Sequence, residues 1–437
     1  MERKRKRDDD GADPKKITRM DSMRVDELLV AARDGDLAEL ERLIRVVGVD
    51  PNKANNNGYT PIHVAAQYGH LNVIQYLVEK AKVQDPNKAN NNNGYTPFHV
   101  AAHYGHLNVV RYLVEEAKAD PNKADNNGYT PIYIAASNNR LDVVRYLVEK
   151  ARADPNKADE MGWTPIYVAA SHGHLDVVRY LVEEANADPN KADKEGETPI
   201  HIAAGEGHLN VIQYLVKEAK VKDPNKADIG GQTPIHVAAH WGQLDAIKYL
   251  IEEANADPNK ADIFYGRTPI HFAAHWGHLD IVRYLVEEAR ANPNKADKEG
   301  ETPIYDAAHW GRLDIVRFLV EEANADPNIA NNKGETPIYA AAQDGNLDIV
   351  RYLVEEANAD PNIANNKGET PIYAAAQDGN LDVVRFLVEE AKADPNKPDN
   401  NGWTPIKAAA LRRRNDVVEY LSMKMSEVLE SKRIRKY

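Results

Sequence analysis

Two groups of three histidines are the first candidates for chemistry in this sequence. In each group the histidines fall at positions i, i+4 and i+7, a spacing that brings them toward one side of a helix. The groups are His99, His103 and His106, and His271, His275 and His278. Imidazole is a common zinc ligand, but no acidic ligand and no His-Glu-x-x-His core accompanies these residues. We therefore predict that they are structural and that the chain holds no metal ion.

Covalent catalysis has even less support from the residue types. Cysteine is absent, which excludes thiolate nucleophiles, thiolate metal sites and disulfides. Serine is scarce, and no serine stands in a nucleophile-elbow or Ser-x-x-Lys setting. Paired carboxylates such as Glu183 and Glu184 recur from unit to unit, which is typical of a solvated face. We predict that the chain is not an enzyme, has no catalytic or cofactor-binding residues and needs no cofactor.

An internal repeat positions all of these side chains. Thr-Pro recurs eleven times between Thr60 and Thr404, at spacings of 34 to 36 residues, and Asp-Pro-Asn keeps pace with it. Self-similarity at a period of this size is the signature of a repeat array. Proline therefore marks positions inside a repeated unit and does not mark linkers between domains.

Residues 161–190 serve as the type unit. Thr164 suits a helix N-cap, and Pro165 suits the first helical position, where a missing N–H does no harm. Gly173 can adopt the left-handed conformation that ends a short helix. A second helix follows, in which Val178, Leu181, Val182 and Ala185 form an apolar stripe. Asx- and Gly-rich segments before the next Thr-Pro predict hairpin-like turns. One unit cannot bury its own stripe, so the units must stack.

The repeated pattern G-x-T-P-[IF]-[HY]-x-A-A-x-x-G-H-L-[DN]-V-V resembles the ankyrin repeat and covers about residues 24–437. The resemblance implies an all-α solenoid of helix-turn-helix units joined by β-hairpin-like loops. It also implies a structural role for the histidines of the Thr-Pro-x-His and Gly-His positions. Most units have 34 residues, and the extra residue lies where the family usually has glycine, at positions such as Lys118, Asn186 and Asn255. The conformation of that junction is left open by the sequence.

The resemblance also suggests how the chain is divided. Residues 1–20 are expected to be a disordered tail of mixed charge, and residues 21–437 form the repeat domain. Within that domain we expect an N-terminal capping repeat at 21–55, internal repeats at 56–400, and a C-terminal capping repeat with a basic tail at 401–437. The glycine and leucine of the repeat are lost at Arg412-Arg413-Arg414-Asn415, as suits a C-terminal cap with a polar outer face.

The residues most informative about function are those that vary while the repeat frame is constant. In ankyrin arrays the two residues after Ala-Ala usually line the concave groove, and here the second of them is tryptophan in three consecutive units. Each tryptophan is preceded by a histidine, giving His240-Trp241, His275-Trp276 and His309-Trp310. We expect these tryptophans to form a ladder that either binds a partner protein or packs neighbouring repeats together.

Other departures from the repeat gather in the same units. One hairpin tip carries Phe264 and Tyr265, where most tips are polar, and Asp306 replaces an apolar residue of the first helix. Clustered departures of this kind are expected at functional sites. At the variable position beyond the tryptophans stand Asp344 and Asp378, which favour a partner whose apolar segment is followed by a basic one.

Charge and composition restrict the partners further. The net charge is −13, but residues 1–20 carry +3 and residues 411–437 carry +4, which leaves −20 on the repeat body. Such a body repels nucleic acid and anionic membranes. No apolar run is long enough for a membrane helix. We expect a monomer in a reducing compartment, the cytoplasm or the nucleus or both. The tail resembles a bipartite nuclear import signal, with the basic residues Arg3, Lys4, Arg5, Lys6, Arg7, Lys15 and Lys16.

We therefore expect a scaffold or adaptor that binds another protein in the groove of the units spanning about residues 230–312. Two alternatives remain open. One is a nuclear regulator that contacts DNA through its basic tails. The other is a host-directed effector of a parasite, virus or intracellular bacterium. The sequence identifies neither the partner nor the pathway.

Overall fold

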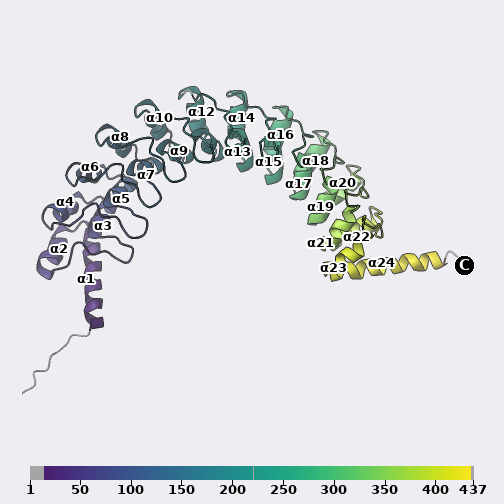
Figure 1. Cartoon of the computed structure of the whole chain (residues 1–437), viewed down its shortest axis with the longest axis horizontal. Helices are drawn as coiled ribbons and strands as arrows, with labels where there is room; N and C mark the ends of the chain where they lie inside the picture. The colour runs from purple at the N-terminus through teal and green to yellow at the C-terminus, as the bar shows by residue number, and fades with distance from the viewer. Residues whose placement is uncertain (1–13, 220, 435–437) are drawn as a thin grey trace, which may run out of the picture. The chain divides into compact units, whose positions relative to one another are not determined.

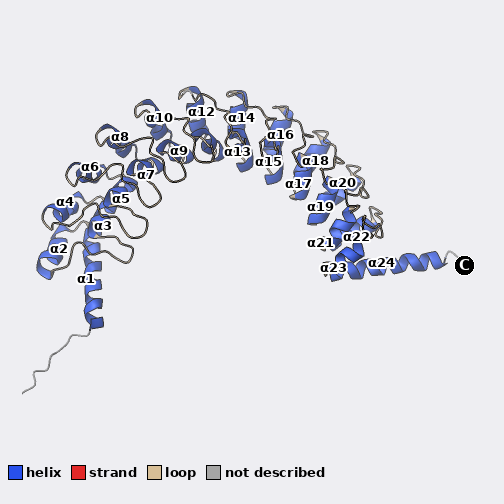
Figure 2. Cartoon of the chain, in the orientation of Figure 1, coloured by secondary structure: helices blue, strands red, loops and turns tan. Residues whose placement is uncertain are grey.

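The computed structural model describes residues 14–219 and 221–434, and all regular structure in these residues is helical, with 24 α-helices and one short π-helical segment (Figure 2). The helices alternate between two rows, which we call first helices and second helices. The all-α repeat architecture is therefore confirmed.

The first helices are α1 (Pro14–Asp34), α3 (Pro61–Tyr68), α5 (Pro97–Tyr104), α7 (Pro131–Ser137), α9 (Pro165–Ser171), α11 (Pro199–Gly205), α13 (Pro234–Trp241), α15 (Pro269–Trp276), α17 (Pro303–His309), α19 (Pro337–Asp344), α21 (Pro371–Asp378) and α23 (Pro405–Leu411). The second helices are α2 (Leu37–Arg42, continued by the π-helical segment Leu43–Val47), α4 (Leu71–Glu79), α6 (Leu107–Glu115), α8 (Leu141–Glu149), α10 (Leu175–Glu183), α12 (Leu209–Lys217), α14 (Leu244–Glu252), α16 (Leu279–Glu287), α18 (Leu313–Glu321), α20 (Leu347–Glu355), α22 (Leu381–Glu389) and α24 (Asn415–Ile434).

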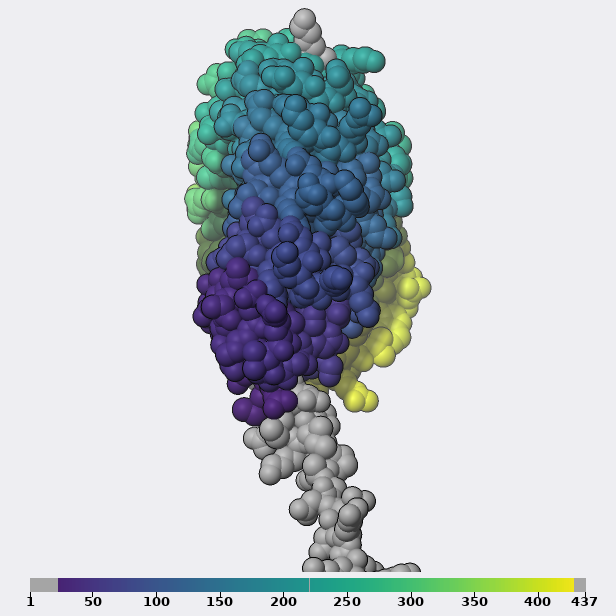
Figure 3. Space-filling view, turned by 90° about the vertical axis from the view of Figure 1, so that its left-hand side faces the viewer, coloured from purple at the N-terminus to yellow at the C-terminus, as the bar shows by residue number. Residues whose placement is uncertain are grey.

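The helices belong to two compact units, divided between Lys194 and Glu195, with the short segment Lys217–Val221 joining the first unit. In the first unit, successive first helices from α1 to α9 pack on one another, and so do the second helices from α2 to α10. The space-filling view shows repeats of this unit in direct contact in sequence order (Figure 3). In the second unit the same two rows run from α11 to α23 and from α14 to α24 (Figure 1).

The starts of the first helices follow the Thr-Pro prediction. In the type unit, the hydroxyl of Thr164 accepts a hydrogen bond from the backbone N–H of Tyr167 at 3.4 Å, and Pro165 stands at the first helical position. This cap satisfies one of the free N–H groups that every helix start leaves. The short helix that follows is buried on Ile166, Ala169 and Ala170, whose small or branched side chains let neighbouring helices approach closely.

The second helices bury a face slightly different from the predicted stripe. In α10, Val177, Val178, Tyr180 and Leu181 are buried, whereas Val182 is only half-buried. The difference arises because α10 packs both on its own first helix, α9, and on the preceding second helix, α8. Two sides of the helix are therefore covered, not a single narrow stripe.

The junction left open by the sequence has a left-handed backbone. Lys118, Asn186 and Asn255 have φ angles of 56°, 55° and 54°, the conformation that glycine adopts without strain. In this chain the three positions carry lysine or asparagine in place of glycine. Gly173 is also left-handed, with φ of 70°, and ends the first helix of the type unit as predicted.

The loops between repeats are tight turns whose tips bond to one another. Oδ1 of Asp125 accepts hydrogen bonds from the backbone N–H groups of Asn127 and Tyr129, at 2.9 and 2.7 Å. The N–H of Asn126 then donates to the carbonyl of Asn93 in the preceding tip at 3.0 Å. The loops are hairpin-like in this sense, and no strand forms in the described part of the chain.

The ends of the chain differ from the internal repeats. Helix α1 begins at Pro14, so the backbone of residues 14–20 is helical where we expected a disordered tail, and proline at a helix start is compatible with its fixed φ. At the other end, Arg413 takes the left-handed place of the missing glycine, with φ of 58°, and leads into α24. The division into capping and internal repeats stays a prediction.

Candidate protein-binding surface

The histidines that follow Thr-Pro are structural. In α5 the hydroxyl of Thr96 donates to Nδ1 of His99 at 2.8 Å, and Nε2 of His99 donates to the carbonyl of Tyr129 in the next tip at 3.2 Å. Both ring nitrogens are thus used in the neutral form. Burial disfavours the charged ring and lowers the pKa of His99 to about 4. His271 has the same arrangement with Thr268 and Glu301.

The histidines of the Gly-His positions link neighbouring repeats. Nε2 of His106 donates to the carbonyl of Gln67 at 2.9 Å, and Nε2 of His278 donates to the carbonyl of His240 at 3.1 Å. These contacts confirm the structural interpretation of both positions. The middle histidine of each group, His103 or His275, takes no part in these hydrogen bonds. In the described part of the chain, no three His, Asp or Glu side chains are grouped as metal ligands.

The three tryptophans lie in the second unit, at or just after the ends of neighbouring first helices, and remain exposed. The exposed fraction is 63% for Trp241, 46% for Trp276 and 48% for Trp310. Their indole rings are separated by histidine rings: the ring centroid of His240 lies 4.7 Å from that of Trp276, and His275 lies 4.4 Å from Trp310.

Each histidine also contacts the tryptophan that follows it in sequence. The centroid distances are 4.8 Å from His240 to Trp241, 5.0 Å from His275 to Trp276 and 5.1 Å from His309 to Trp310. The result is a continuous row of alternating indole and imidazole rings, which we call the aromatic ladder: Trp241, His240, Trp276, His275, Trp310 and His309. Histidine rings pack on the indole of the next repeat at Trp276 and Trp310, and all three indoles keep much of their surface exposed. Whether the ladder binds a partner or only packs repeats together stays a prediction.

The unusual hairpin tip presents a second apolar surface. Ile263, Phe264 and Tyr265 are 59%, 63% and 60% exposed. The buried Asp262 holds this tip, because its Oδ1 accepts backbone hydrogen bonds from Tyr265, Gly266 and Arg267 at 2.9, 2.7 and 3.2 Å. The apolar side chains are thus displayed on a rigid turn.

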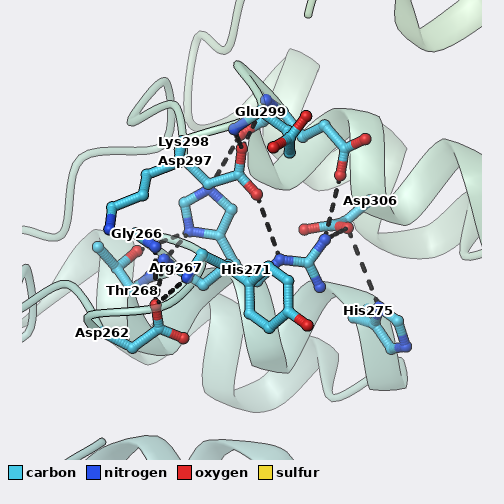
Figure 4. Close-up of polar contacts among 12 residues, drawn as sticks. Asp262, Gly266, Arg267, Thr268, His271, His275, Asp297, Lys298, Glu299 and Asp306 are labelled. Carbon is cyan, nitrogen blue, oxygen red and sulfur yellow. Dashed lines mark hydrogen bonds and ion pairs between the residues drawn. The ribbon is translucent and has the colours of Figure 1, made fainter. Parts of the chain in front are cut away.

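Arg267 connects the tip to the ladder (Figure 4). Its Nε donates to Asp297 at 3.2 Å, and its Nη2 donates to Glu301 at 3.1 Å and to Asp306 at 3.2 Å. Asp306 in turn lies 3.9 Å from Nδ1 of His275, a member of the ladder. The predicted Asp306 is therefore part of a charged cluster in which one guanidinium faces three carboxylates.

The carboxylates of the cluster and their burial affect one another's titration. Burial and the charges of Asp306 and Asp297 raise the pKa of Glu301 above its ordinary value, although Arg267 opposes this. At the far end of the ladder, Nδ1 of His309 lies 2.8 Å from Oδ2 of Asp344. The contact with that carboxylate raises the pKa of His309.

Asp378 lies one repeat beyond Asp344. Burial raises its pKa, and Arg412 and Arg414 oppose that effect. Its carboxylate is therefore partly balanced by the arginines of the last repeat.

Arg267 and Glu301 were not predicted from the sequence. Both occupy the position directly before Thr-Pro, which is aromatic in the first four such repeats and mostly charged in the later ones. From Tyr59 to Trp403 this position reads Tyr, Tyr, Tyr, Trp, Glu, Gln, Arg, Glu, Glu, Glu, Trp. The signal for both residues is the variation at this position along the chain, which parallels the variation at the position after Ala-Ala.

The predicted import signal lies outside the part of the chain that can be examined. Arg3, Lys4, Arg5, Lys6 and Arg7 precede the first described residue. The backbone of Lys15 and Lys16 belongs to α1, but their side chains are not described. Separately, none of the described helices has the length and apolar character needed to cross a bilayer.

Comparison with known proteins places the repeats in a family. The family model described as "Ankyrin repeats (3 copies)" matches in seven overlapping blocks: residues 28–125, 117–193, 185–262, 256–331, 290–365, 323–399 and 340–431. Three curated relatives have short similar segments. Espin-like protein of Mus musculus is 35% identical over 68 residues, which is 16% of this chain and 7% of that protein.

Two further curated proteins are also similar over short segments. Alpha-latrocrustotoxin-Lt1a of Latrodectus tredecimguttatus is 36% identical over 70 residues, 16% of this chain and 5% of the toxin. Notch-regulated ankyrin repeat-containing protein of Homo sapiens is 43% identical over 49 residues, 11% of this chain and 42% of that protein. The chain thus matches less than half the length of each of these relatives. Because the family model covers nearly the whole described repeat array, the chain belongs to the ankyrin-repeat family, whose members generally serve as protein-interaction modules.

Proposed function

We propose that this chain is a non-catalytic scaffold or adaptor that binds a partner protein across the aromatic ladder and the neighbouring tip of Ile263, Phe264 and Tyr265. The observation that carries the proposal is the exposure of three tryptophans in consecutive repeats, each 46% exposed or more. Exposed indole rings held by a rigid frame are typical anchors of protein interfaces. The family's general role as an interaction module agrees with this use.

The charges beside the ladder favour one kind of partner. Asp344 lies at the end of the ladder, in contact with His309, and the cluster of Glu301 and Asp306 lies along its side. A partner segment with apolar side chains for the indoles and a basic stretch beyond them would match this arrangement. We propose such a segment as the ligand, bound by a monomer in the cytoplasm, the nucleus or both.

The test is a substitution in the ladder with a matched control. Ligands would be selected from a displayed protein-fragment library against the intact chain, and their dissociation constants measured for Trp276→Ala and Trp403→Ala. Trp403 is also exposed, at 41%, but lies outside the ladder. We expect Trp276→Ala to weaken binding by about 2 kcal/mol, roughly 30-fold, and Trp403→Ala to have little effect.

Thermal unfolding of both variants separates binding from packing. If Trp276→Ala lowers the unfolding temperature strongly while the affinity of the selected ligands is unchanged, the ladder serves packing alone. Equal loss of affinity in both tryptophan variants would also contradict the proposed surface.

A further inference from the structure

A hollow of about 310 Å³ opens beside the ladder between the first helices α15, α17 and α19. Arg267 and His275 form one side of it, and Tyr305, Asp306 and Trp310 come from α17 and the residue after it. Glu301 and Glu335 complete its acidic wall. We call this site the acidic hollow.

The buried carboxylate of Asp306 is incompletely satisfied. Its side chain is only 3% exposed, and Oδ1 accepts a hydrogen bond from Nη2 of Arg267 at 3.2 Å. Oδ2 is buried and has no hydrogen-bond partner. A buried carboxyl oxygen without a hydrogen-bond partner is costly, so it points to a donor that a ligand would bring.

The charge balance around this oxygen favours a cationic ligand. Arg267 is shared among Asp297, Glu301 and Asp306, with contacts of 3.2, 3.1 and 3.2 Å, so one guanidinium serves three carboxylates. Glu335 adds a fourth carboxylate to the surroundings and Lys333 a second cation. A positively charged ligand would compensate the carboxylates that these two cations leave unbalanced, whereas an anion would be repelled.

Aromatic rings line the same hollow and suit the stem of a basic side chain. Trp310 is 48% exposed, and its other side packs on His275 with a centroid distance of 4.4 Å. Tyr305 lies on α17, which ends one residue before Trp310, and its hydroxyl donates to Glu335 at 3.2 Å. A lysine or arginine would place methylene groups against the indole and its charge near Asp306, a combination that adds a cation–π attraction.

From this geometry we infer that the acidic hollow binds the side chain of one lysine or arginine of the partner protein. The inference rests on the proposed function for its source of ligand, but the hollow itself can be tested without any partner. It assigns a particular subsite to the basic part of the ligand, next to Trp310, and makes Asp306 a determinant of specificity.

The experiment uses the full chain labelled with 5-fluorotryptophan, with the Trp310 resonance assigned from Trp310→Phe. Nα-acetyl-arginine methylamide, Nα-acetyl-lysine methylamide and the neutral isostere Nα-acetyl-citrulline methylamide would be titrated separately. We expect a saturable shift of the Trp310 signal with arginine, lysine or both, and at least tenfold weaker binding of citrulline. The two cationic probes distinguish guanidinium from ammonium as the preferred group.

Two variants of Asp306 test its role, and each is chosen so that the repeat keeps its fold. Asp306→Asn keeps the shape of the side chain, and Asp306→Ala reproduces the residue at the same position of the next two repeats, Ala340 and Ala374. Both variants are expected to weaken binding of the cationic probe at least tenfold. Glu288→Gln, which changes an exposed carboxylate outside the hollow, is expected to leave that binding unchanged. Equal binding of arginine and citrulline, or full binding by Asp306→Asn, would overturn the inference. If the chain binds the cationic probe but Trp276→Ala does not weaken binding of the selected protein ligands, the proposed function is contradicted and the acidic hollow is not.

Discussion

At the scale of single residues, the junction after each second helix is the clearest departure from what a sequence pattern alone can specify. Nine non-glycine residues at this one register position have φ angles between 51° and 59°. They are Lys82, Lys118, Arg152, Asn186, Asn255, Arg290, Asn324, Asn358 and Lys392. The left-handed conformation brings Cβ close to the backbone carbonyl and costs roughly 1–2 kcal/mol for most side chains. Stacking of the repeats on both sides of the junction compensates this local strain.

The strain predicts a stabilising substitution. Lys118→Gly is expected to raise the free energy of unfolding by about 0.5–1 kcal/mol, because glycine removes the Cβ clash but loses more backbone entropy on folding. Urea denaturation of the full chain, followed by circular dichroism, measures the change. Asn186→Gly should gain less, since asparagine tolerates this conformation better than lysine. A destabilised Lys118→Gly protein would show that the lysine side chain has a role that outweighs the strain.

At the scale of elements, the Thr-Pro pattern predicts the helix starts well because both residues act locally. Threonine caps through a hydrogen bond three residues away, and proline fixes φ at the first helical position. The buried face of the second helices was harder to predict, because it depends on two neighbouring elements. Val182, which belongs to the predicted stripe, is half-buried, whereas Tyr180 is buried.

Two kinds of cap make a testable difference between repeats. The Thr130 hydroxyl accepts from the N–H of Tyr133 at 3.4 Å, whereas the Thr96 hydroxyl also donates to Nδ1 of His99 at 2.8 Å. Thr130→Val should destabilise the fold by about 1 kcal/mol, the usual value of an N-cap. Thr96→Val should cost about 1 kcal/mol more, because it removes a second buried hydrogen bond.

Unfolding free energies of the two valine variants, beside Thr96→Ser as the conservative control, measure the difference. Serine keeps the hydroxyl and should retain most of the stability. Equal losses for the two valine variants would mean that the bond from threonine to histidine contributes nothing net.

At the scale of the molecule, the repeat period predicted a stacked array, because each unit follows the same local rules and needs its neighbours to bury apolar surface. The resemblance of the repeated pattern to the ankyrin repeat implied that this array is all-α. The candidate site was only partly predictable. The three tryptophans stand out at one register position, but the bond from Arg267 to Asp306 joins residues 39 apart at two different positions. Comparing one position at a time does not reveal contacts between positions. The alternation of histidine and tryptophan rings likewise depends on side-chain placement across repeats.

The distribution of buried histidines predicts how the whole array responds to acid. After Thr-Pro-Ile or Thr-Pro-Phe, five repeats carry histidine and five carry tyrosine. The histidines are His63, His99, His201, His236 and His271, and the tyrosines are Tyr133, Tyr167, Tyr305, Tyr339 and Tyr373. Burial lowers the pKa of all five histidines, to about 4 for the first four. Tyrosine does not titrate in the acid range.

The sign of the effect follows from which state binds protons. Below the ordinary histidine pKa of 6.5, the unfolded chain takes up protons that the folded repeats exclude, so stability is complete above pH 6.5 and falls as the pH drops toward 4. At pH 5 each histidine with a folded-state pKa of about 4 destabilises its repeat by about 2 kcal/mol. The raised pKa values of His309 and Glu301 have the opposite effect on stability, but both residues belong to the second unit and not to the repeats of His63 and His99.

Hydrogen exchange followed by mass spectrometry at pH 7 and pH 5, corrected for intrinsic rates, resolves this prediction repeat by repeat. Protection of α3 and α5, which contain His63 and His99, should fall by at least tenfold more than that of α19 and α21, which contain Tyr339 and Tyr373. The mechanism also requires that the loss reverses when the pH is restored, because it involves proton uptake and no covalent change. A uniform loss of protection along the array would instead place the acid sensitivity in the carboxylates that all repeats share, and the buried histidines would then have no special part in it.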